Sequence, residues 1–152
     1  MKEEEIVIRK ALTKDIPQII QLVRELAIYE KSEDKMLVGL TTYQDAFDAG
    51  HFEAFIVEVD SQIAGIALYY SRFSTWRGPI LYLEDFIVRQ QYRRKGLGKL
   101  LFECFISEAR ERKYEMCAWQ VLDWNEPAIS FYNKYDAVYE DCWVDVKMYL
   151  SN

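Results

Sequence analysis

A buried strand, a basic glycine loop and an amphipathic helix follow one another between residues 80 and 109, and this order constrains the fold most. The apolar segment 80–88 predicts a buried strand, and apolar residues at helical spacing over 97–109 predict a helix. A further strand is expected over 116–121. Because a strand–helix–strand connection within one sheet is right-handed, these two strands should be parallel neighbours.

The remaining segments predict hairpin-connected strands and three more helices. Period-two alternation and β-branched residues indicate strands, and apolar residues at helical spacing indicate helices. We expect an α/β (α+β) fold with a mixed, mostly antiparallel sheet of six to seven strands and about four helices. The expected strands begin at 6–8 and cover 52–59, 63–70, 137–140 and 143–150, and the expected helices cover 16–29, 42–48 and 126–135.

Length and charge narrow the class of protein. A chain of 152 residues has the usual size of one compact domain, so we expect a single domain over 1–152. No apolar run approaches the roughly 20 residues that cross a bilayer, and the start lacks a leader pattern, so we expect a cytoplasmic protein with no membrane partner. The formal charge of -6 argues against nucleic acid and favours a cationic substrate, with plain solubility as the alternative explanation of the acidity.

Cysteine and histidine give no sign of a metal or a disulfide framework. Cys104, Cys117 and Cys142 are odd in number and lie in apolar segments, which predicts buried thiols in a reducing compartment. His51 is the single histidine, and no metal-ligand spacing surrounds it. We therefore expect no metal.

The loop Arg93–Gly98 has the features of a phosphate cradle. Gly96 and Gly98 allow close backbone approach and unusual φ, and the helix that begins there aims unpaired N–H groups at an anion. The spacing is not that of a P-loop, because Lys99 is not followed by Ser or Thr, and the third glycine of a dinucleotide fingerprint would fall at Leu101. A solvated basic helix start is the alternative.

Two carboxylates interrupt the apolar strand at Glu84 and Asp85. Burying an ionised carboxylate without a partner costs several kcal/mol, so we expect these side chains to face a polar cavity or paired cations. By strand alternation they point to opposite faces unless a bulge intervenes. A structural ion pair is the alternative to a functional site.

The segment Trp124–Pro127 predicts a helix start. Asn125 is a favourable N-cap, Glu126 suits the helix dipole, and Pro127 fits the first turn. Helical spacing alone makes Tyr132 a core aromatic.

Taken in this order, these residues resemble the GNAT superfamily of acetyl-CoA-dependent N-acetyltransferases over nearly the whole chain. The loop Arg93–Gly98 matches the pyrophosphate pattern [QR]-x-x-G-x-[GA] of that superfamily. Segments 25–30, 81–86 and 124–127 are similar to the diamine, polyamine and thialysine acetyltransferases.

The resemblance implies acetyl-CoA as co-substrate, a small cationic amine as acceptor and a homodimer. Splayed parallel strands would hold pantetheine at the backbone of 86–88, and Tyr132 would be the general acid that protonates the departing thiolate. Glu84 is our hypothesis for the base, acting through water. The cofactor-binding residues would be Phe86, Ile87, Val88, Arg93, Arg94, Lys95, Gly96, Leu97, Gly98, Lys99, Asn125 and Tyr132, and the acceptor-binding residues Tyr29, Glu30, Trp76, Glu84 and Asp85.

Two departures from the resemblance bear on the acceptor. Asp136 stands where the superfamily usually has glycine, and segment 137–145 is shorter than in the polyamine enzymes, so Glu140 and Asp141 receive no role. The alternatives are acetylation of another amine, such as an amino acid, an antibiotic or a protein, and a CoA-binding module without catalysis. A covalent cysteine mechanism is disfavoured, because apolar surroundings raise the pKa of a thiol.

Overall fold

Alternating apolar residues build a five-stranded sheet in the order β1-β2-β3-β4-β5, within a computed structural model that describes residues 2–150. All neighbours are antiparallel except β4 and β5, which are parallel, as predicted. The turn between β2 and β3 is tight because Asp60 and Ser61 both adopt positive φ. The strands are β1 (Ile6–Lys10), β2 (Glu53–Val59), β3 (Gln62–Ser74), β4 (Gly78–Val88) and β5 (Cys117–Trp119).

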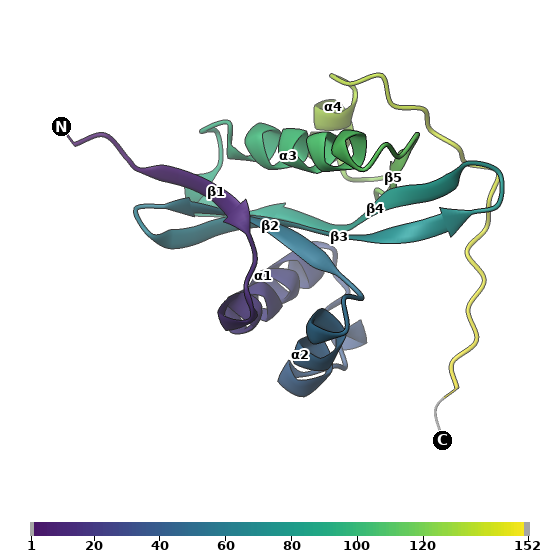
Figure 1. Cartoon of the computed structure of the whole chain (residues 1–152), viewed down its shortest axis with the longest axis horizontal. Helices are drawn as coiled ribbons and strands as arrows, with labels where there is room; N and C mark the ends of the chain where they lie inside the picture. Colours follow the sequence, from purple (N-terminus) through teal and green to yellow (C-terminus); the bar gives the residue numbers. More distant parts are fainter. Residues whose placement is uncertain (1, 151–152) are drawn as a thin grey trace. The chain divides into compact units, whose positions relative to one another are not determined.

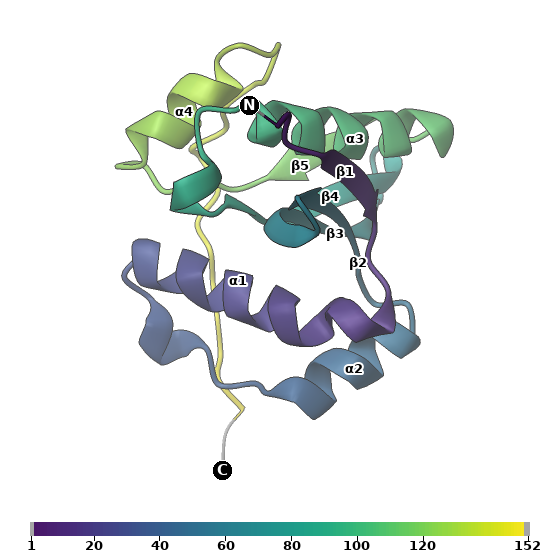
Figure 2. The same ribbon diagram turned by 90° about the vertical axis from the view of Figure 1, so that its left-hand side faces the viewer.

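Helices cover both faces of this sheet. The helices α1 (Ile16–Tyr29) and α2 (Leu40–Asp48) lie on one side, and α3 (Leu97–Glu111) lies on the other (Figures 1 and 2). Short 3₁₀ turns at 13–15, 33–35 and 90–92 precede or connect the helices. These elements form the first of two compact units, residues 1–120; the second comprises 121–152.

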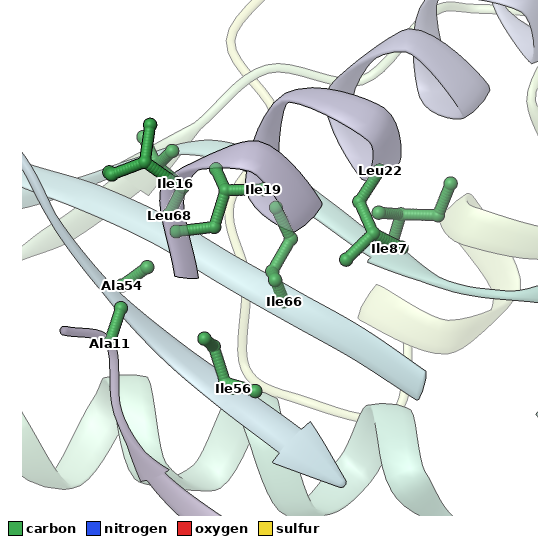
Figure 3. Packing of buried hydrophobic residues seen from close by; sticks show 9 residues of the cluster. All are labelled: Ala11, Ile16, Ile19, Leu22, Ala54, Ile56, Ile66, Leu68 and Ile87. Atoms are coloured by element: carbon green, nitrogen blue, oxygen red, sulfur yellow. The ribbon is translucent and has the colours of Figure 1, made fainter. Parts of the chain in front are cut away.

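An aliphatic cluster fills the space between α1 and the sheet (Figure 3). Ile16, Ile19 and Leu22 of α1 are fully buried, at the helical spacing seen in the sequence. Ile66 and Ile87 meet them from β3 and β4, so these strand positions point toward α1. The complete cluster is Ala11, Ile16, Ile19, Leu22, Ala54, Ile56, Ile66, Leu68 and Ile87.

Aromatic side chains pack the opposite face of the sheet against α3. Phe86 of β4 stacks on Phe102 at 5.8 Å between ring centroids, and Tyr69 of β3 lies 5.8 Å from Phe105. Phe102 also meets the edge of Trp119 from β5. The residues of β4 therefore alternate between the α3 side and the α1 side along most of the strand.

The second unit contains one helix, α4 (Glu126–Tyr132), and an extended tail. The two strands predicted over 137–140 and 143–150 were wrong, because this part of the chain forms neither helix nor strand. Its apolar residues are solvent-exposed, with Val144 at 84% and Val146 at 90%. Alternation alone does not make a strand, because a strand also requires a neighbour with which its backbone can pair. In the described chain the sheet thus has five strands, fewer than the six to seven expected.

Candidate active site

The strands β4 and β5 pair over only three residues and then part. Leu81, Tyr82 and Leu83 lie opposite Cys117, Ala118 and Trp119, where β5 ends. The strand β4 continues to Val88 with β3 as its neighbour. No residue of β5 pairs with β4 beyond Leu83, and we call the stretch of β4 from Glu84 to Val88 the opened edge of β4.

The loop after β4 presents the N-terminus of a 15-residue helix. Arg94 and Gly96 adopt positive φ of 65° and 76°, which turns the chain sharply into α3. No side chain caps this helix, so the N–H groups of its first turn have no partner within the helix. An uncapped helix start with Arg94, Lys95 and Lys99 around it suits a phosphate group.

The basic side chains of this loop have different partners. The Arg93 Nε donates to the Val88 carbonyl oxygen at 2.9 Å, and Lys95 forms an ion pair with Glu4, with Nζ 2.7 Å from Oε2. The Lys99 Nζ lies 4.0 Å from the Glu103 Oε1. Arg93 is thus directed back toward the strand, although the side chains of Arg93 and Arg94 are both exposed.

Two residues predicted to bind the cofactor can do so only through their backbone. Leu97 is 1% exposed and belongs to the core. Gly98 adopts helical φ, not the unusual conformation expected for it, and an added Cβ would make ordinary contacts at 3.7 Å with Phe86 and 3.9 Å with Val88. Gly98 therefore meets no steric limit from the protein itself.

A β-bulge brings Glu84 and Asp85 onto one face of the sheet. Asp85 lies opposite Leu68 and Leu83 lies opposite Tyr69, so Glu84 is the extra residue between two register positions. Leu68 packs toward α1 and Tyr69 toward α3, which places Asp85 on the α1 side. A bulge places two consecutive side chains on the same side, and Glu84 interacts there with Tyr70.

The charges around this pair raise the pKa of its buried member. Burial raises the pKa of Asp85 to about 7, with further contributions from the charges of Glu84 and Glu30. Burial also raises the pKa of Glu30, at the C-terminal end of α1. The structure thus brings together three of the five residues predicted to bind the acceptor, Glu30, Glu84 and Asp85, which we call the anionic patch.

Two tyrosines that the sequence analysis missed border this patch. Burial raises the pKa of Tyr43 on α2, and the charge of Asp85 adds to it. Burial likewise raises the pKa of Tyr70 on β3, and the nearby Glu84 carboxylate adds to it. Tyr70 could have been found from the alternation that it shares with Ile66 and Leu68, whereas no sequence signal marked Tyr43.

The other two predicted acceptor residues lie apart from the patch or at its margin. Tyr29 is 39% exposed, and the Arg93 guanidinium lies 5.9 Å from its ring centroid. Trp76 is 83% exposed in the turn between β3 and β4. About 20 Å of strand separates Gly78, next to that turn, from Glu84. Trp76 is therefore not brought to the carboxylates along this strand.

The second unit holds Asn125 and Tyr132. The Asn125 Oδ1 accepts a hydrogen bond from the Ala128 N–H at 3.4 Å, which confirms the predicted N-cap. Tyr132 is 6% exposed, and its ring lies 5.5 Å from that of Phe131. Asp136 does not adopt positive φ, so the aspartate creates no backbone strain there.

The cysteines only partly match the expectation of buried thiols. Burial raises the pKa of Cys104 and raises that of Cys117 to about 11, which opposes thiolate formation at neutral pH. Cys142 is exposed, contrary to the expectation, because it lies in the extended tail. Among residues 2–150 no three His, Cys, Asp or Glu side chains are grouped to hold a metal ion, and no helix there is long and apolar enough to span a bilayer.

Comparison with known proteins shows the family to which the chain belongs. Residues 16–136 match the acetyltransferase (GNAT) family. The chain is 34% identical to the thialysine N-epsilon-acetyltransferase of Caenorhabditis elegans, across 80% of this chain and 76% of that protein. It is 33% identical to the human spermidine/spermine N(1)-acetyltransferase-like protein 1, across 86% of this chain and 20% of that protein.

Solved structures show the same fold at lower identity. An aminoglycoside acetyltransferase from an uncultured soil metagenomic sample superposes with a TM-score of 0.80 at 21% identity, covering 96% of this chain and 97% of that one. A predicted acetyltransferase from Clostridium acetobutylicum, solved with acetyl-CoA, gives a TM-score of 0.73 at 18% identity, covering 94% and 96%.

The fold and the site together define an acyl-transferring enzyme. The chain belongs to the GNAT family of acetyltransferases, and its relatives act on amines.

Proposed function

We propose that this enzyme moves the acetyl group of acetyl-CoA to a primary amine of a small cationic acceptor, such as a diamine, a polyamine or a thialysine-like amine. The observation that carries the proposal is the anionic patch of Glu30, Glu84 and Asp85 beside the opened edge of β4. These negative charges would attract a cationic amine and hold it next to the strand where the thioester is expected. The thialysine and spermidine/spermine relatives support this acceptor class.

The cofactor site of the proposal follows the opened edge of β4 and the start of α3. Backbone groups of Phe86, Ile87 and Val88 would hold the pantetheine arm, and the loop Arg93–Lys99 would hold the pyrophosphate. The uncapped helix start and its cationic side chains fit an anionic group of that size. When bound, acetyl-CoA supplies the activated acetyl thioester.

The chain's own residues supply proton transfer in this proposal. An amine with a pKa near 10 arrives as ammonium and must lose a proton before it attacks a carbonyl carbon. Glu84 is exposed on the sheet face and would accept that proton through water. Tyr132 would donate a proton to the leaving thiolate, and Asn125 would contact CoA.

A different amine is the second candidate acceptor. The aminoglycoside acetyltransferase with the same fold supports it, and an anionic patch suits any polycation. A non-catalytic CoA-binding module would be supported if CoA bound tightly and no amine were acetylated.

An acceptor panel tests the proposal. Release of CoA from acetyl-CoA is measured with thialysine, lysine, putrescine, spermidine and an aminoglycoside, and with a neutral amine as the matched control. We expect the highest kcat/KM for one of the short diamines, polyamines or thialysine, falling as ionic strength rises because charge steers the substrate. Equal rates for cationic and neutral amines would contradict the acceptor class.

A homodimer is the assembly that this proposal includes. The exposed tail carries alternating apolar residues, namely Val144, Val146, Met148 and Leu150, each more than 80% exposed. Such a segment suits pairing with a sheet edge of a second copy. Light scattering of the full chain and of a chain ending at Glu140 measures this directly: we expect a dimer that the truncation converts to a monomer, and a monomeric full chain would contradict it.

The domain and the location complete the proposal. We propose that both units act as one acetyltransferase domain, because the family match at 16–136 runs across them. We also propose that the enzyme is cytoplasmic, because the cytoplasm contains acetyl-CoA and keeps cysteine thiols reduced. Cell fractionation followed by immunoblotting tests the location.

A further inference from the structure

We infer that Asp85 is a second catalytic carboxylate, which together with Glu84 takes up the proton that the acceptor's ammonium group must lose. The inference rests on the proposed amine acetylation and goes beyond it, because Asp85 was assigned there only to acceptor binding. It makes the base a pair of carboxylates, of which Asp85 keeps the proton.

The bulge in β4 is the geometric basis of this pair. Consecutive residues of a regular strand point to opposite faces, and a bulged residue breaks that rule. Because Glu84 is the extra residue between Asp85 and Leu83, its side chain shares the α1 face with Asp85. A single register shift therefore turns two separated carboxylates into neighbours, beside the opened edge of β4.

The two members of the pair differ in their exposure to water. Glu84 is exposed and Asp85 is half-buried. Within residues 2–150 neither carboxylate forms a salt bridge, so no ion pair among these residues holds Asp85 in its charged form. Glu84 is thus placed to meet the ammonium group first, with Asp85 behind it.

The groups that face Asp85 all disfavour its negative charge or are neutral at pH 7. They are Glu84 on β4, Glu30 at the end of α1 and Tyr43 on α2. The charge of Arg24 of α1 acts on Tyr43, and the charge of Glu84 acts on Tyr70. Burial, followed by the charges of Glu84 and Glu30, raises the pKa of Asp85 to about 7. A base whose pKa lies near the working pH combines a large deprotonated fraction with useful basicity.

The proton balance of the step is simple. The ammonium N–H bond breaks, its electron pair stays on nitrogen, and the proton passes through water beside Glu84 to the Asp85 carboxylate. The neutral amine then attacks the thioester carbonyl carbon, and the carbon–sulfur bond breaks as the thiolate takes the Tyr132 proton. The nitrogen loses its second proton to that phenolate, and Asp85 releases its proton to solvent. The sum is ammonium plus acetyl-CoA giving amide, CoA thiol and one proton.

The interaction between the two carboxylate charges determines the direction in which the pH profile should shift. Below a pH of about 7 Asp85 is protonated and cannot accept a proton, so kcat/KM for the amine should fall on the acid side. In Glu84→Gln the neighbouring negative charge is gone. The pKa of Asp85 then drops, and the acid limb must move to lower pH.

The experiment is the pH dependence of kcat/KM for the best amine, measured on the full-length wild type, Glu84→Gln, Asp85→Asn and the control Glu111→Gln. Glu111 is exposed on α3, on the opposite face of the sheet, so its profile should match the wild type. We expect an acid limb near pH 7 in the wild type, a shift to lower pH in Glu84→Gln, and loss of that limb in Asp85→Asn. Asp85→Asn should also lower kcat by about 100-fold or more.

A second readout separates the inference from the proposed function. Carboxyl-carbon NMR of ¹³C-labelled protein follows the Asp85 titration without any amine, and Asp85→Asn assigns the signal. We expect a carboxyl that titrates near pH 7 and moves lower in Glu84→Gln. A wild type that acetylates no amine would overturn the proposed function, whereas an Asp85 that titrates near 4 would overturn the inference alone. An Asp85→Asn enzyme that keeps the acid limb, with only a raised KM for the amine, would overturn it as well. If Asp85→Asn does not fold, the Glu84→Gln shift decides, because an unmoved acid limb contradicts the pair.

Discussion

The Arg93 Nε donates a hydrogen bond to the Val88 carbonyl oxygen across 2.9 Å. Val88 is the last residue of β4, so this bond fastens the basic loop to the strand along which pantetheine would lie. The same guanidinium lies 5.9 Å from the ring centroid of Tyr29, at the end of α1. Arg93 therefore positions the loop. The positive charge that would bind the phosphates is supplied by Arg94, Lys95 and Lys99.

Arg94→Ala should weaken acetyl-CoA binding without changing the chemistry. A hydrogen bond to a charged group is worth about 1.5–3 kcal/mol, so we expect KM for acetyl-CoA to rise about tenfold or more while kcat stays near the wild-type value. Steady-state kinetics at saturating amine measure this. Arg110→Ala, an exposed arginine in the last turn of α3, is the matched control. An unchanged KM in Arg94→Ala would remove this residue from the phosphate site.

Tyr132→Phe should lower kcat by about 100-fold or more and leave the fold intact. Phenylalanine keeps the ring that packs near Phe131 and loses only the hydroxyl that would protonate the thiolate. Stopped assays of CoA release give kcat, and circular dichroism checks the fold. Tyr139→Phe is the control within the same unit, since the exposed Tyr139 hydroxyl donates to Asn133 Oδ1 and the Ile129 carbonyl oxygen. Full activity in Tyr132→Phe would exclude it as the general acid.

Gly65→Ala should destabilise the protein where β3 approaches β4. A Cβ there would lie 2.7 Å from the Ile87 carbonyl oxygen and 3.2 Å from Leu101. Backbone on a central strand cannot move away easily, so we expect a loss of about 1–3 kcal/mol in the free energy of unfolding. Urea unfolding measures it. Gly98→Ala, with ordinary contacts at a helical position, should instead gain about 0.5–1 kcal/mol, and equal effects of the two changes would contradict this account.

Asp15 should make stability depend on pH in the acid range. Its carboxylate accepts hydrogen bonds from Arg9 at 2.7 and 2.9 Å, and this contact lowers its pKa despite its burial. A lowered folded-state pKa means that the stabilisation is present above the unfolded value of about 3.9 and is lost as pH falls through the folded value.

Asp15→Asn therefore should cost about 1–3 kcal/mol at pH 7 and clearly less at pH 3. Urea titrations at the two pH values measure the difference. Asp48→Asn, an exposed carboxylate at the end of α2, should show no such trend. A cost in Asp15→Asn that is the same at both pH values would contradict the ion pair.

Local sequence patterns predicted most of the sheet and the loop. The apolar run to Val88, the stripe from Leu97 and the glycine at 96 each have a direct physical meaning, and the structure confirms the parallel pair and the positive φ of Gly96. Asn125 as an N-cap was found in the same way. These features depend on neighbours in the chain, which a sequence displays.

Features that depend on distant partners could not be predicted. The bulge at Glu84 is set by the register between β3 and β4, and two adjacent carboxylates do not reveal it. The tail from 137 to 150 has the alternation of a strand and yet forms no strand in the described chain. Tyr43 is close enough to the anionic patch for the charges of Asp85 and Glu84 to act on it. Its position depends on how α2 packs, and no sequence pattern indicates that packing.

Mass spectrometry of the amine after incubation with acetyl-CoA shows whether this enzyme acetylates a cationic amine. Thialysine and spermidine are each incubated with the full-length enzyme, with boiled enzyme as the control. We expect at least one of them to gain a single acetyl group on a primary amine, in an amount equal to the CoA released. CoA binding without an acetylated product from these or any other cationic amine would contradict the account.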